Sequence, residues 1–74
     1  MAAYKKSEMN RRRAQWAKCA IDSFRAATRT DREDALCDLL CDLMHYARQH
    51  RFNFTGELDR ATFHFNAEAQ GGDE

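Results

Sequence analysis

The chain lacks several residues and patterns whose absence restricts its fold. Its 74 residues include no proline and no valine, and Ile21 is the one β-branched aliphatic residue. The three glycines stand late in the chain, at Gly56, Gly71 and Gly72. Proline and glycine interrupt helices, while β-branched residues favour strands. This composition therefore predicts an all-α protein.

Long apolar runs and a cysteine framework are missing too. No apolar run approaches the roughly 20 residues of a membrane-spanning helix, so we expect no membrane partner. The first residues, MAAYKKSEMNRRR, contain no apolar core of a secretory signal. The cysteines are odd in number, at Cys19, Cys37 and Cys41. These features predict reduced thiols in a cytosol.

The strongest helix signal is the stretch TDREDALCDLLCDLMHYARQH, from Thr30 to His50. Thr30 and Glu33 are spaced for a capping box, so we predict that each side chain bonds the backbone amide of the other residue. An apolar stripe at helical spacing follows: Leu36, Leu39, Leu40, Leu43 and Ala47. We predict a central helix over 31–50.

Two further helical patterns flank this stretch, with Ser7 and Thr55 as their predicted N-caps. We predict a small three-helix bundle in a single domain, 1–74, with helices over about 8–28, 31–50 and 55–69. The last two form an antiparallel hairpin with the first packed across them, and the ends are flexible at 1–6 and 70–74. The predicted core is Trp16, Ala20, Phe24, Leu36, Leu39, Leu40, Leu43, Ala47, Phe54, Leu58, Ala61 and Phe65.

The net charge of zero hides a polarity along the chain. Residues 1–30 carry eight Lys or Arg against two acidic residues, which gives +6, and residues 31–74 carry four against ten, which gives −6. Two copies would therefore be complementary in charge. Several large apolar residues also lack an evident place in the core: Met44, Tyr46, Phe52 and Phe63. We predict a homodimer.

An acidic stripe recurs at helical spacing in the central helix, at Asp34, Asp38, Asp42 and then His45. Carboxylates four residues apart repel one another, so a cationic group is expected opposite them. The stripe is interpreted as a solvated face, a divalent-metal site or a partner-binding surface. We favour partner binding through Asp34, Asp38 and Asp42.

A basic cluster, Arg11, Arg12 and Arg13, lies near the start of the first helix, close to Trp16. Such a cluster binds nucleic-acid phosphates, with the indole as a stacking surface, or engages an acidic protein surface. The alternative is a solvated helix end with Trp16 in the core. We count these three arginines among the candidate partner-binding residues.

Signals of catalysis and of cofactor binding are weak. There is no glycine-rich phosphate loop and no nucleophile with a recognisable base. Cys37, Cys41 and His45 line up over two turns of one helix, so they cannot all converge on one tetrahedral zinc ion. We expect no metal and no cofactor, and a binding protein is favoured over an enzyme.

The segment over residues 30–68, which includes EDALCDLLCDLMHYARQHRFNFTGELDRATFHFNAE, resembles small helical proteins carried by prophages and other mobile elements. Its two helices are also similar to the last two helices of MazG-type nucleotide pyrophosphohydrolases. The matching residues are Asp38-Leu39-Leu40, Ala47-Arg48, Phe52, Leu58, Ala61 and Phe65. That family binds Mg²⁺ through a Glu-x-x-Asp pair, and this chain has Ala35 three residues before Asp38.

The resemblance to mobile-element proteins implies a binding protein that blocks a host protein or ribonucleoprotein complex. An anti-CRISPR or other anti-defence inhibitor is the concrete form of this prediction. The MazG likeness implies the alternative, an Mg²⁺-dependent nucleotide pyrophosphohydrolase or nucleotide binder that uses Asp34, Asp38 and Asp42. A nucleic-acid-binding accessory protein is the second alternative.

Overall fold

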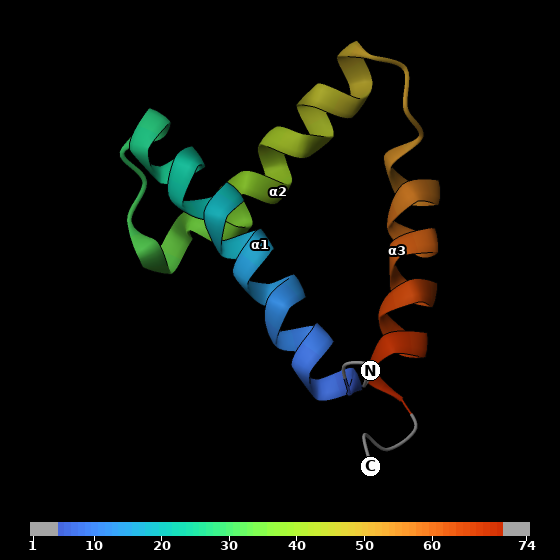
Figure 1. The fold of residues 1–74 in the computed structure, drawn as a ribbon. Coiled ribbons are helices and arrows are strands. Elements are labelled where there is room, and N and C mark those ends of the chain that lie inside the picture. Colours follow the sequence, from blue (N-terminus) through green and yellow to red (C-terminus); the bar gives the residue numbers. More distant parts are fainter. Residues whose placement is uncertain (1–4, 71–74) are drawn as a thin grey trace.

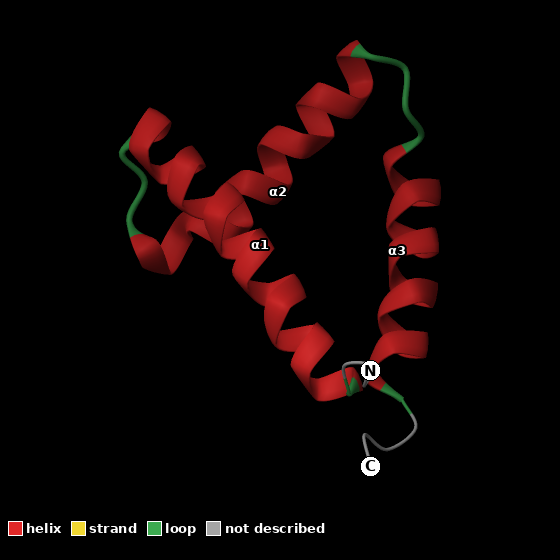
Figure 2. Ribbon diagram, in the orientation of Figure 1, coloured by secondary structure: helices red, strands yellow, loops and turns green. Residues whose placement is uncertain are grey.

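A computed structural model of the chain describes residues 5–70 (Figure 1). It contains three helices, with no strand among the described residues (Figure 2): α1 (Lys6–Thr28), α2 (Arg32–Gln49) and α3 (Phe54–Ala69). The predicted all-α fold is therefore confirmed, and every helix boundary lies within two residues of its predicted position. None of the helices in this part of the chain is both long enough and apolar enough to cross a membrane.

The residues that begin α1 and α3 differ from the predicted caps. Helix α1 starts after Lys5, not Ser7, and the Lys5 amide donates to Glu8 Oε1 at 3.1 Å. Helix α3 starts after Asn53, whose side-chain oxygen accepts a 3.1 Å hydrogen bond from the amide of Gly56. Asn53 therefore satisfies one of the free amides in the first turn of α3, the role predicted for Thr55.

The capping box predicted at Thr30 is wrong. Helix α2 has Asp31 as its N-cap, with no hydrogen bond from the Asp31 side chain to the helix. The Thr30 hydroxyl lies 2.7 Å from that of Thr28, and the Thr30 carbonyl accepts from Arg25 Nε at 3.2 Å. Thr30 therefore belongs to the corner between α1 and α2, because its side chain is already bonded to the end of α1.

Both connections place an arginine in the left-handed region of backbone conformation. Arg29 follows α1 with φ of 61°, and Arg51 follows α2 with φ of 64°. At Arg29 this conformation lets the amide donate to the Arg25 carbonyl at 2.7 Å and end the helix. Glycine adopts such a conformation at lower cost. Neither connection contains one, since the first glycine of the chain is Gly56.

The three helices form the sides of an open triangle (Figure 1). Helix α1 crosses α2, and α3 returns from the 50–53 connection toward the start of α1, in roughly the opposite direction to α2. The triangle closes where the Lys6 ammonium donates to the Gln70 carbonyl at 2.9 Å. Of the ends expected to be flexible, residues 1–4 and 71–74 lie outside the described part of the chain.

The predicted core is not formed within a single chain. Ala35 and Ala47, with 1% and 5% of their surface exposed, are the only buried residues among those described, and Ala47 alone had been predicted. Phe24, Leu39 and Phe54 are half-buried. The other eight predicted core residues are exposed: Trp16, Ala20, Leu36, Leu40, Leu43, Leu58, Ala61 and Phe65. The three helices therefore leave most of their apolar stripes exposed within a single chain.

Candidate interaction surfaces

Helix α2 presents its three candidate carboxylates together. Asp34, Asp38 and Asp42 are all exposed and stand one above the other, because residues four apart share a helix face. Their rise along the axis is about 6 Å per step. Within the described residues, no ion pair or side-chain hydrogen bond engages any of them. The predicted acidic stripe is thus a row of uncompensated negative charge.

The opposite side of α2 carries an apolar stripe. Leu36, Leu40 and Met44 each follow an aspartate of the acidic stripe by two residues, which in a helix is a rotation of about 200°. They line a shallow surface groove together with Glu33, Cys37 and Cys41. The exposed fractions of Leu36, Leu40 and Met44 are 61%, 43% and 54%. Helix α2 therefore exposes an acidic side and an apolar side.

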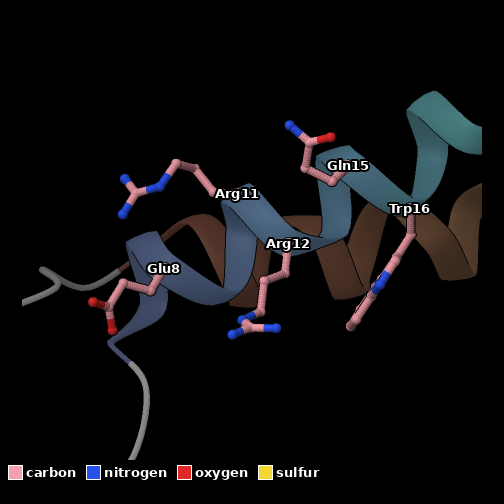
Figure 3. Close-up of a pocket in the computed structure, with 5 residues that line it drawn as sticks. All are labelled: Glu8, Arg11, Arg12, Gln15 and Trp16. Carbon is pink, nitrogen blue, oxygen red and sulfur yellow. The ribbon is translucent and has the colours of Figure 1, made fainter.

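The predicted basic cluster on α1 is divided in the structure. Arg11 and Arg12 line a shallow pocket with Glu8, Gln15 and Trp16, all from one helix (Figure 3). Arg12 and Trp16 project to one side of α1 in that view, and Arg11 and Gln15 project to another. Trp16 is 60% exposed, so the interpretation of a core tryptophan is wrong for the isolated chain.

Arg13, unlike Arg11 and Arg12, contacts the end of α3. Its Nε lies 3.4 Å from Glu68 Oε2 at the end of α3, and its Nη1 donates to Asn10 Oδ1 at 2.9 Å. Asn10 in turn donates from Nδ2 to the Glu68 carbonyl at 3.0 Å. These contacts satisfy the last turn of α3, where carbonyls lack partners inside the helix. Sequence reasoning missed Asn10 and Glu68, which lie in different helices.

Some of the charge on α1 is balanced within the helix. Lys18 Nζ donates to Asp22 Oδ2 at 2.7 Å, four residues away. This hydrogen bond, with further attraction from Lys18 and Arg25, holds the pKa of the Asp22 carboxyl below its ordinary value. Asp22 therefore offsets part of the positive charge on α1, whereas none of the ion pairs among residues 5–70 reaches the acidic stripe of α2.

The residues considered for metal binding are not gathered into a site. In the described part of the chain, no group of three or more His, Cys, Asp or Glu side chains is placed to hold a metal ion. Cys19, Cys37 and Cys41 are free thiols, and each is exposed. His45 continues the acidic stripe on α2, as its spacing predicts.

Comparison with known proteins adds no relative. No family model matches the chain, and no curated protein or solved structure shows significant similarity to it. The resemblances to mobile-element proteins and to MazG-type hydrolases therefore stay predictions.

Proposed function

We propose that the chain is a small non-enzymatic binding protein of a phage or related mobile element that occupies a surface of a host complex. An anti-CRISPR or other anti-defence inhibitor acting in the host cytoplasm is the concrete form. The observation that supports it is the row of Asp34, Asp38 and Asp42, exposed on one side of α2 without a counter-charge among the described residues.

The target surface on this proposal is cationic and normally binds nucleic acid. A rigid row of carboxylates resembles a phosphate backbone in its charge, and such a row attracts a basic groove over a distance set by the ionic strength. Association is therefore fast and weakens as salt is added. The mobile-element origin comes from the resemblance of residues 30–68 and is part of the proposal.

The test combines charge reversal with competition by nucleic acid. The tagged chain is used to capture its target from host lysate, and the captured complex is then assayed for binding of labelled DNA or RNA. The triple variant Asp34→Lys, Asp38→Lys, Asp42→Lys is expected to lose capture and to leave nucleic-acid binding by the target intact. The double variant Arg11→Glu, Arg12→Glu is the matched control. It is expected to capture the target and to compete with nucleic acid as the unmodified chain does.

A specific observation favours one second candidate, direct nucleic-acid binding through α1. Trp16 is exposed on the same side of the helix as Arg12, an arrangement suited to stacking on a base beside a phosphate (Figure 3). On this candidate the chain binds nucleic acid by itself, and the Arg11→Glu, Arg12→Glu variant loses binding. The chain is also incubated with nucleotides and Mg²⁺ to test the MazG alternative. That alternative requires release of pyrophosphate, and Asp38→Ala should abolish it.

A further inference from the structure

The single chain exposes far more surface than a closed domain of its size. Its accessible surface is 6562 Å², whereas a folded monomer of 8.6 kDa exposes about 4,700 Å². Its radius of gyration is 14.9 Å, against about 11 Å for a compact chain of this length. The excess of about 1,900 Å² lies in the range that each subunit of an obligate homodimer buries, from about 1,000 Å² upward. The excess is larger than the about 800 Å² that each partner buries in a standard interface, so a second copy would cover part of it.

One exposed face has the pattern that pairing with a copy of itself requires. Leu36, Leu40 and Met44 recur every four residues along α2 and line its shallow apolar groove. Glu33 begins this face in the first turn of the helix, and Arg48 ends it in the last turn. Both charged residues are exposed, and neither forms an ion pair within the described part of the chain.

The charges at the two ends select the direction of pairing. In a twofold interface, each contact between two positions occurs twice with the roles exchanged. If two α2 helices pair antiparallel with Leu40 on the axis, Leu36 faces Met44 of the partner subunit. Glu33 then faces Arg48 of the partner subunit, seven and eight residues from the axis. Parallel pairing would instead place Glu33 against Glu33 of the partner subunit, where like charges repel.

We propose that this chain forms an antiparallel twofold homodimer along Leu36, Leu40 and Met44 of α2, closed at each end by Glu33 and Arg48 of the partner subunit. The acidic stripe lies on the far side of α2, so dimer formation leaves Asp34, Asp38 and Asp42 exposed in both copies. The dimer is therefore independent of the target proposed above, and its tests use the purified chain alone.

The first test measures mass in solution at low micromolar concentration by analytical ultracentrifugation. The full chain is expected at twice its mass of 8.6 kDa, and Leu40→Glu is expected at the monomer mass. Leu58→Glu makes the same change at an exposed leucine of α3 and is expected to stay dimeric. A monomeric full chain, or dissociation by Leu58→Glu but not by Leu40→Glu, overturns the proposal.

The second test fixes the direction and does not rely on a disruptive variant. The native cysteines are replaced by serine, and one cysteine is placed at Leu36, Leu40 or Met44. Leu40→Cys is expected to form a disulfide-linked dimer on mild oxidation, because position 40 meets itself across the axis. Leu36→Cys and Met44→Cys are expected to cross-link only when mixed. Equal cross-linking of each variant with itself indicates a parallel pair, and no cross-linking places the interface elsewhere, so either result contradicts the proposal.

The third test concerns the charged ends. Glu33→Arg or Arg48→Glu alone sets like charges against each other twice per dimer and is expected to raise the dissociation constant about tenfold. The double variant restores the pairing with the charges exchanged. Its dissociation constant is expected to lie within about threefold of the original value. Additive weakening in the double variant would contradict the contact between Glu33 and Arg48.

Discussion

The crossing of α1 and α2 and the attachment of α3 are built in different ways. At the crossing, Ala35 of α2 is fully buried, and a groove between the helices is lined by Ala17 and Ile21 of α1. Helix α3 contains no buried residue. The Asn53 cap closes its first turn locally, and polar contacts such as Asn10 to Glu68 hold its end against α1.

This difference indicates which part of the chain depends on close packing. A crossing over a small side chain brings two helices together and tolerates little added volume. Contacts between partly exposed polar groups are individually weak and compete with water. We therefore expect α1 and α2 to form the stable part of the chain, with α3 opening locally at lower cost.

Enlarging Ala35 is the change expected to have the largest effect. Ala35→Leu adds volume where α1 crosses α2 and should lower the free energy of unfolding by about 1–3 kcal/mol. Ala26→Leu makes the same substitution at an exposed position of α1 and should change the free energy of unfolding by less than about 0.5 kcal/mol. Urea unfolding followed by circular dichroism measures both values. Equal stabilities would show that the helices do not approach closely at Ala35.

Removing the cap of α3 should have a smaller effect. Asn53→Ala deletes the oxygen that accepts from the Gly56 amide and should cost about 1 kcal/mol. Asn66→Ala is the matched control, because Asn66 is exposed within α3 and its side chain has no partner in the described part of the chain. Thermal unfolding of both variants tests the cap. If Asn66→Ala destabilised the chain as much as Asn53→Ala does, the role of the Asn53 cap would be refuted.

The helices of this chain could be predicted from sequence, and their burial could not. The absence of proline and the late position of Gly56 leave little to interrupt α1 and α2. An apolar stripe shows which side of a helix avoids water, but it does not show what covers that side. Here α1 crosses α2 at Ala35, so Leu36 and Leu40 stay exposed despite lying on the predicted core stripe.

The candidate surfaces were predictable only where they depend on one helix. The row of Asp34, Asp38 and Asp42 follows from spacing alone. The division of the basic cluster does not, because neighbouring residues point about 100° apart and the position of α3 decides which of them it meets. Arg13 meets Glu68 through a contact between distant segments, and such a contact leaves no local pattern in the sequence.

Breaking the contact between Arg13 and Glu68 should have the smallest and most local effect, and it tests how α3 is attached. Arg13→Met keeps most of the aliphatic length but removes the ion pair, whose two side chains are 38% and 37% exposed. Because water screens such a pair, the loss should stay below about 1 kcal/mol, and global unfolding should hardly change. The amides in the last turn of α3 should nevertheless exchange with solvent up to about fivefold faster, since that turn loses a contact with α1. Arg11→Met is the control, because Arg11 forms no ion pair in the described part of the chain. Faster exchange in both variants, or in neither, would show that Arg13 does not hold the end of α3.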